Sequence, residues 1–432
     1  MYSRSPSPRK QPADSASTAP VRIVPEATRY EDGPDKMPNL ALFEAEFFAV
    51  FKHLRPKTMV LDRVHTTSLG DAMSEVLTRP EKFRPNGKYT AETLEHISIE
   101  MLEEVDADFA DGQAFAQTFS AEGEPVYFFV QPISVDGGMM NPVSWLPGSM
   151  PWHKELFRFS EADQLDGASL AAWHEFGHVL FEDQNFEEHT TERIHQTRAP
   201  SILREDMLSN AEETFSDSYA IGLIMRPEQD RPKGSPPLHT PTTDILRNFI
   251  HLRVIHAISH ITIGSGGLKH VPNPHWRNLA RNFAKADAPR DHIGIGEMAM
   301  EHVIDRQPSD KGYRRIVQDF WDLNPDGFEQ KGLSGPAFLA KIGKVGKNAD
   351  HANSYVLARD YLEVLDQRLP AQDPIRKNVE KARETLQQNP KSALWDRRFP
   401  GIEATLSAIS LTRKRTATAQ PKPGRDARPP GP

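Results

Sequence analysis

A five-residue stretch near the middle of the chain constrains the protein more than any other feature. Residues 174–178 are His-Glu-Phe-Gly-His. In an α-helix, side chains four residues apart lie one above the other, so His174 and His178 present two imidazoles to one point beside the helix. Glu175 follows the first histidine and is placed to act as a general base on a water molecule at that point. The spacing therefore predicts a helix that carries two metal ligands and a catalytic carboxylate.

The residues around this motif predict that its helix is buried. Apolar residues occupy seven nearby positions: Ala171, Ala172, Trp173, Phe176, Val179, Leu180 and Phe181. The preceding segment 166–169, Asp-Gly-Ala-Ser, supplies residue types that cap helices, so we expect the helix to start there. Two histidines inside such a helix need polar partners. A pair of core histidines bonded to the backbone or to each other is the alternative to a metal site.

A catalytic zinc site has three protein ligands and one open position, so a third ligand must come from elsewhere in the chain. The metzincin continuation is excluded, because it requires Gly and His or Asp where Phe181 and Gln184 stand. A second amphipathic helix is expected over residues 210–224, and its Glu213 and Asp217 share one face at i, i+4. This helix therefore offers a carboxylate ligand.

Two other glutamates compete for the role of third ligand. Glu212 neighbours Glu213, but it lacks an acidic partner four residues on, where Ser216 stands. Glu182 lies four residues past His178 on the motif helix, although a charged residue at a helix end is typically solvated. We predict Glu213 as the ligand and keep Glu212 and Glu182 as alternatives.

The motif together with residues 213–217, Glu-Thr-Phe-Ser-Asp, resembles the gluzincins, the clan of thermolysin-like zinc peptidases. The resemblance implies one Zn²⁺ per chain, with His174, His178 and Glu213 as ligands. It also implies that Asp217 holds His174 in the correct tautomer and orientation. The order His-Glu-Phe-Gly-His and then Asn-x-x-Glu-x-Phe is similar to lethal-factor-type catalytic domains as well. The tyrosine which that family places before its glutamate ligand is absent, because Asp206 stands seven residues before Glu213.

The group that would stabilise the tetrahedral intermediate has several candidates. A helix expected over residues 243–261 carries His256 and His260 at i, i+4, and gluzincins often draw this group from a later helix. The same pair is compatible with a second metal site, or with ordinary histidines of an amphipathic helix. Tyr219, six residues past Glu213, is a further candidate and equally suits a core position.

Composition excludes several classes of protein. The 432 residues contain no cysteine, which rules out zinc fingers, disulfides and cysteine nucleophiles. No apolar run approaches the length of a membrane span, and residues 1–10 lack the apolar region of a secretory signal. We expect a cytoplasmic protein or one exported without a conventional signal peptide. The Ser/Pro-rich N-terminus is typical of secreted bacterial effectors.

Charge is distributed unevenly along the chain. The net charge is −8; residues 1–22 carry +3 and residues 411–432 carry +5, which leaves −16 for residues 23–410. This acidic middle part argues against a nucleic-acid groove. We therefore expect no nucleic-acid partner, and no membrane span; the resemblance to gluzincins implies a protein or peptide substrate.

Sequence patterns predict five regions. Two tails are expected to be disordered, residues 1–36 and 411–432. Between them we expect a mainly helical region over 37–121, a zincin catalytic core over 122–262 and a helical C-terminal lobe over 263–410. Residues 125–135 form the best candidate strand, and Pro132 favours an edge position for it.

These observations predict an α+β, zincin-like metalloprotease fold that is predominantly helical and has a small mixed sheet. The expected activity is hydrolysis of peptide bonds through a zinc-bound water activated by Glu175. One alternative is a catalytically inactive zinc-containing binding module, and another is a metal-dependent hydrolase of a non-peptide amide. Glu175 favours an enzyme, because a purely structural zinc site needs no general base.

Overall fold

The chain divides into two compact units. The computed structural model describes residues 22–23, 46–54, 58–62, 115–121, 124–131, 160–195, 201–233, 235, 238–263, 269–306, 310–321, 323 and 335–419. The motif unit comprises Met1–Gln196, Ala211–Ala220 and Glu228–Thr240, and the C-terminal unit comprises Thr197–Asn210, Ile221–Pro227 and Pro241–Pro432. Each unit is described separately below.

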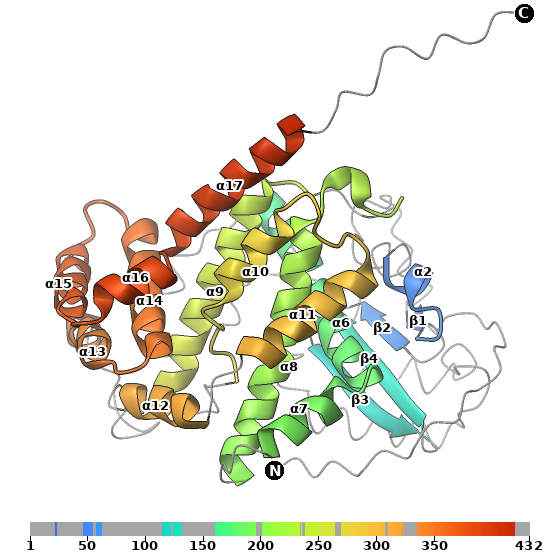
Figure 1. Ribbon diagram of the computed structural model, residues 1–432, viewed down its shortest axis with the longest axis horizontal. Coiled ribbons are helices and arrows are strands. Elements are labelled where there is room, and N and C mark those ends of the chain that lie inside the picture. Colours follow the sequence, from blue (N-terminus) through green and yellow to red (C-terminus); the bar gives the residue numbers. More distant parts are fainter. Residues whose placement is uncertain are drawn as a thin grey trace, which may run out of the picture. The chain divides into compact units, whose positions relative to one another are not determined.

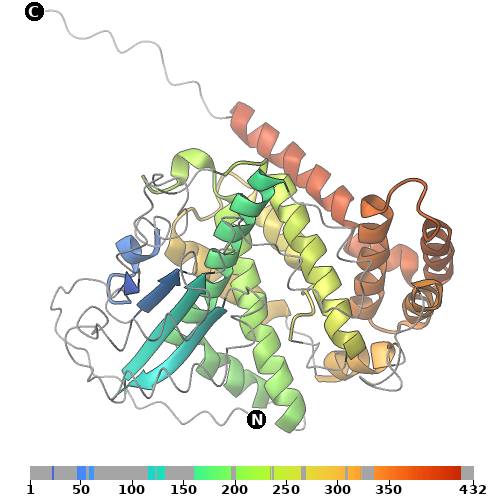
Figure 2. The same ribbon diagram turned by 180° about the vertical axis from the view of Figure 1, so that it is seen from behind.

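The motif unit contains a four-stranded sheet in the order β1-β2-β4-β3 (Figures 1 and 2). Its strands are β1 (Arg22–Ile23), β2 (Thr58–Asp62), β3 (Phe115–Ala121) and β4 (Glu124–Gln131). β2 pairs in parallel with both β1 and β4, whereas β3 and β4 are antiparallel. The predicted strand over 125–135 is β4, but its predicted edge position is wrong, because β4 hydrogen-bonds to a strand on each side. Pro132 lies outside the described residues.

Helix α6 (Glu161–Asp183) carries the His-Glu-Phe-Gly-His motif and contacts β3 and β4. It begins at Glu161, before the predicted start in residues 166–169. Ser160 is its N-cap: the Ser160 hydroxyl accepts the Asp163 N–H at 3.1 Å, and the Asp163 carboxylate accepts the Ser160 N–H at 3.1 Å. Asp166 lies inside the helix, where its buried carboxylate accepts the backbone N–H groups of His239 and Thr240, each at 2.8 Å. The Asp166 side chain, which the sequence suggested as a helix cap, therefore binds a loop far away in the chain.

Aromatic side chains form the core around α6. Phe47, which precedes α2 (Phe48–Val50), stacks on Phe176 of the motif with ring centroids 3.7 Å apart, and neither side chain is exposed. After α6, Asn185 takes a left-handed conformation with φ 55°, which asparagine tolerates better than most residues, and the chain turns into α7 (Phe186–His195). Phe181 and Phe186 both pack on Phe215 of helix α8 (Ser201–Met225). These contacts attach α8 to the motif helix, and the short η9 (Glu228–Asp230) follows.

All regular secondary structure among the described residues of the C-terminal unit is helical. Its elements are α9 (Thr242–Ile263), α10 (Trp276–Phe283), α11 (His292–Arg306), α12 (Asp310–Trp321), α13 (Gly335–Asn348), α14 (Ala352–Arg368), α15 (Arg376–Gln387), α16 (Ser392–Arg398) and α17 (Ile402–Ala419). α14 contacts α9, α12, α13, α15 and α16, so it lies at the centre of this unit. Arg277 on α10 is fully buried and pairs with Asp360 on α14.

The predicted fold class is wrong. Helices make up most of the described residues, so the protein is mainly α-helical rather than α+β. The strands are short, with 2, 5, 7 and 8 residues. No helix among the described residues has the length and apolar character needed to cross a membrane.

Several predicted boundaries also differ. Arg22 and Ile23, in the predicted N-terminal tail, form β1, and residues 411–419, in the predicted C-terminal tail, continue α17. The other residues of 1–36 and residues 420–432 lie outside the described chain. α9, predicted to be part of the catalytic core, belongs to the C-terminal unit. Described residues of 37–121 include two strands: β2 pairs with β4, which is far away in the sequence, and β3 forms a hairpin with β4.

Two buried histidines make the stability of the C-terminal unit depend on pH. Burial and the neighbouring Arg368 lower the pKa of His251 from 6.5 to about 3, and burial and Arg226 do the same for His292. Between pH 6.5 and 3, these histidines bind protons in the unfolded chain but stay neutral in the folded protein. Acidification over this range therefore favours the unfolded state and lowers the free energy of unfolding. We expect a loss of up to about 1.4 kcal/mol per pH unit for each histidine.

Urea unfolding between pH 7 and pH 4 measures this dependence. His251→Gln removes one of the two groups and should reduce the slope, whereas His195→Gln, at an exposed position, should leave the slope unchanged. Equal slopes in the wild type and the His251 variant would contradict the assignment.

Candidate metal centre

Helices α6 and α8 approach each other closely beside the motif. A Cβ atom on Gly177 would lie 2.7 Å from the Cα of Ser216, so only glycine fits at this crossing. Gly177 stands between the two motif histidines in sequence, and Ser216 stands between Glu213 and Asp217. The close approach therefore brings the acidic face of α8 to the imidazoles of α6.

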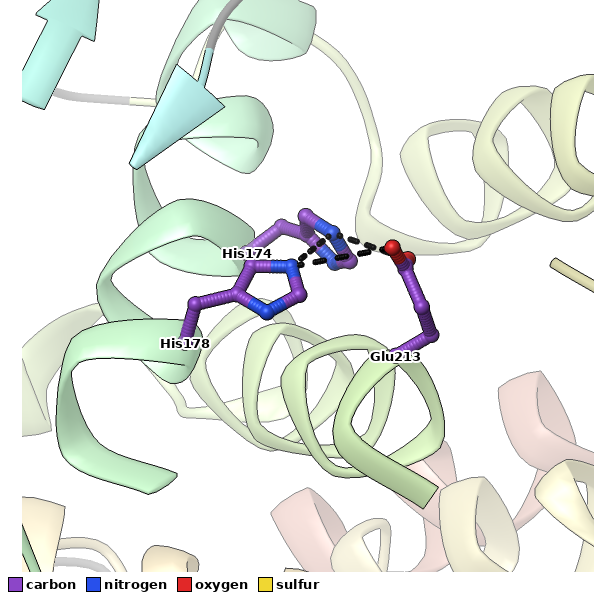
Figure 3. A group of neighbouring side chains, drawn as sticks. All are labelled: His174, His178 and Glu213. Atoms are coloured by element: carbon purple, nitrogen blue, oxygen red, sulfur yellow. Dashed lines mark hydrogen bonds and ion pairs between the residues drawn. The ribbon is translucent and has the colours of Figure 1, made fainter. Parts of the chain in front are cut away.

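Three side chains converge at this crossing (Figure 3). The Nε2 atoms of His174 and His178 are 3.1 Å apart. One Glu213 oxygen lies 3.4 Å from His174 Nε2, and the other lies 4.0 Å from His178 Nε2. His174 and Glu213 are buried, His178 is half-buried, and one ligand atom from each lies within 4.8 Å of the others. This group could hold a metal ion.

Each motif histidine also contacts a carboxylate through its outer ring nitrogen. The Asp217 carboxylate is 2.9 Å from His174 Nδ1, and the Glu212 carboxylate is 3.0 Å from His178 Nδ1. An ionised carboxylate can only accept a hydrogen bond, so in each pair Nδ1–H donates. Both Nε2 atoms then carry lone pairs directed into the group.

The chemistry of this group fits a divalent cation. With both rings neutral, the two Nε2 lone pairs and the Glu213 carboxylate are all hydrogen-bond acceptors, so a divalent cation among them would replace their mutual repulsion with attraction. Zinc bonds of about 2.0–2.1 Å would separate neighbouring ligand atoms of a tetrahedron by about 3.4 Å. The Nε2–Nε2 distance of 3.1 Å and the 3.4 Å between His174 Nε2 and one Glu213 oxygen lie close to this value, whereas the other Glu213 oxygen lies 4.0 Å from His178 Nε2.

The remaining predicted site residues occupy different environments. Glu175 is half-buried on α6, next to His174. The alternative ligand Glu182 is also half-buried but does not belong to the three-residue group. Tyr219 is fully buried and stacks on Phe215, with ring centroids 6.1 Å apart, which is a core position.

The two histidine candidates for the oxyanion role belong to α9 of the C-terminal unit. His256 is half-buried, and its ring centroid lies 4.5 Å from that of His270. His260 lies near the end of the same helix. Among the described residues, His256 belongs to no group with metal-ligand geometry. Their role in stabilising the intermediate remains a prediction.

Sequence reasoning weighed Glu212 only as a rival ligand and missed its contact with His178. The available signal was weak. Neighbouring side chains on a helix differ in direction by about 100°, so Glu212 and Glu213 cannot point the same way. The sequence does not show which residue the Glu212 side chain contacts. The packing of α8 against α6 supplies that answer.

We expect Gly177→Ala to damage both folding and metal binding. The new Cβ meets a backbone atom of Ser216, so α6 and α8 must separate, and Glu213 moves away from the histidines. Overpacking of this kind lowers the free energy of unfolding by about 1–3 kcal/mol. Urea unfolding and zinc titration measure the two effects.

Gly167→Ala on the same helix is the matched control. A Cβ at Gly167 meets nothing within 4 Å. Alanine should raise stability there by about 0.5–1 kcal/mol, because glycine is unfavourable inside a helix. If the two variants behaved alike, the close approach of the helices would not matter for the site.

Comparison with protein-family models, curated proteins and solved structures finds no match to this chain.

Proposed function

We propose that the protein is a zinc-dependent metallopeptidase with a gluzincin-type site. The observation that carries the proposal is the meeting of two imidazole nitrogens and the Glu213 carboxylate at one point, beside a glutamate that follows the first histidine. Imidazole and carboxylate ligands suit zinc, although they also accommodate neighbouring transition metals. The proposed cofactor is one Zn²⁺ per chain.

The proposed reaction assigns a separate role to each side chain. His174, His178 and Glu213 would hold the ion, and Asp217 would keep His174 turned towards it. When bound, Zn²⁺ lowers the pKa of a water molecule and polarises the carbonyl under attack. Glu175 would accept the water proton and pass it to the leaving amine. The substrate would be a protein or peptide.

The number of protein ligands supports an enzyme over a structural zinc site. The group contains three histidine and glutamate side chains, and among the described residues no fourth His, Cys, Asp or Glu joins it. Structural zinc sites close all four positions with protein ligands, whereas catalytic sites keep one open. A general base next to the ligands has no use in a structural site. We infer a protein or peptide partner and no nucleic-acid partner.

Metal analysis and peptide cleavage together test the proposal. The purified full chain is analysed for bound metals and incubated with an unbiased peptide mixture, and the products are identified by mass spectrometry. One zinc per chain with cleavage that a chelator abolishes and added zinc restores is the expected result. Zinc without any cleavage would favour a binding module or a hydrolase of a non-peptide amide. A chain that binds no metal would overturn the proposal.

A further inference from the structure

Glu212 contacts a proposed ligand without being part of the metal-binding group. Its Oε1 atom lies 3.0 Å from Nδ1 of His178, the ring nitrogen that faces away from the group. The neighbouring Glu213 reaches the inner nitrogen of the same ring, with its closer oxygen 4.0 Å from Nε2. Two consecutive residues of α8 therefore contact opposite nitrogens of one imidazole.

The contacts follow a simple order along the two helices. His174 meets Asp217, and His178, one turn later on α6, meets Glu212, five residues earlier on α8. Glu213 lies between these contacts and reaches both inner nitrogens. Over this stretch α6 and α8 thus run in opposite directions, and one helix supplies the metal-ligand carboxylate and both outer carboxylates.

We propose that Glu212 is a positioning residue for metal binding, which holds His178 with Nε2 directed at the ion. This inference rests on the proposed function, because it assumes that the group binds zinc. The Glu212 carboxylate accepts a hydrogen bond from Nδ1–H, so the ring keeps its proton on Nδ1 and its lone pair on Nε2. Without this partner, the ring can rotate about its side-chain bonds or carry its proton on Nε2, and either change removes a ligand.

The charge of Glu212 adds to its orienting effect. Its side chain is 24% exposed and that of His178 is 16% exposed, so water screens their interaction only in part. A carboxylate hydrogen-bonded to a ligand imidazole makes the ring a stronger electron donor, and loss of such a partner costs about 10–100-fold in metal affinity.

Competition with a chromophoric chelator for Zn²⁺ measures the effect on the full-length chain. We expect Glu212→Ala to weaken zinc binding about 10–100-fold, because both the hydrogen bond and the charge are lost. Glu212→Gln keeps an oxygen that accepts the hydrogen bond from Nδ1–H and loses only the charge, so its affinity should lie between those of the wild type and the alanine variant. Glu188→Gln, at an exposed position on α7, should leave the affinity unchanged.

Two further readouts separate positioning from a general structural role. Urea unfolding of the metal-free proteins should give similar free energies for the wild type and Glu212→Gln, which shows that a loss of affinity does not come from misfolding. With Co²⁺ in place of Zn²⁺, the visible spectrum of Glu212→Ala should change in shape, because the His178 ring is no longer held in place.

The outcomes distinguish this inference from the proposed function. If the wild type binds zinc and Glu212→Ala binds it equally well, Glu212 is not a positioning residue, and the proposed function stands. If Glu212→Ala loses zinc as completely as Glu213→Ala, Glu212 is itself a ligand, and the positioning role is wrong. A wild type that binds no zinc overturns the proposed function and this inference with it.

Discussion

Replacing Glu175 with glutamine is expected to abolish peptide hydrolysis and to leave one zinc ion bound per chain. Glutamine has nearly the same size and keeps a hydrogen-bonding oxygen, but it cannot accept a proton. General-base catalysis contributes about 10²–10⁴-fold to the rate, so cleavage should fall by that factor. Glu175 does not belong to the metal-binding group, so zinc affinity should stay near that of the wild type.

The measurement pairs metal analysis with a cleavage assay on a peptide taken from the wild-type product mixture. Glu188→Gln provides the matched control, because it makes the same chemical change at an exposed position on α7. Full activity in the Glu175 variant would remove the general base from the proposed mechanism. Loss of zinc in that variant would instead make Glu175 part of the metal site.

Replacing Glu213 with alanine is expected to weaken zinc binding by more than about 100-fold, since loss of an outer carboxylate alone costs about 10–100-fold. The change removes the carboxylate that lies 3.4 Å from His174 Nε2 and leaves the two imidazoles without an anionic ligand. Peptide cleavage should disappear with the metal, and a moderate excess of zinc should not restore it.

Comparison with Glu182→Ala tests the other glutamate considered as a ligand. Glu182 lies on α6, outside the three-residue group, so its variant should bind zinc with wild-type affinity. Chelator competition on both variants gives the answer. If zinc binding survived in Glu213→Ala and failed in Glu182→Ala, the third ligand would be Glu182 and not Glu213.

The part of the site that depends on local helix geometry could be predicted from the sequence. His174 and His178 share one face of α6 because they are four residues apart, and Glu213 and Asp217 share one face of α8 for the same reason. The structure brings His174, His178 and Glu213 into one group, and it brings Asp217 to the outer nitrogen of His174. Hydrogen bonds within a single helix set these spacings, so they need no information from distant parts of the chain.

Features that depend on distant partners could not be predicted. The start of α6 was misplaced because Asp166, which resembles a cap, instead accepts hydrogen bonds from His239 and Thr240. The edge position of β4 was wrong because β2, a segment far away in the sequence, pairs with β4 on the side opposite to β3. The balance of helix and strand that sets the fold class likewise depends on which segments pair.

By itself, the sequence determined which residue types are available for metal chemistry and how they repeat along two helices. The tertiary structure decided how those helices meet. Gly177 allows α6 to approach the backbone of Ser216, and at that distance Glu212 and Glu213 contact opposite nitrogens of His178. Side-chain direction along a helix follows from a local period of about 3.6 residues, whereas the partner that each side chain meets follows from packing between segments far apart in the chain.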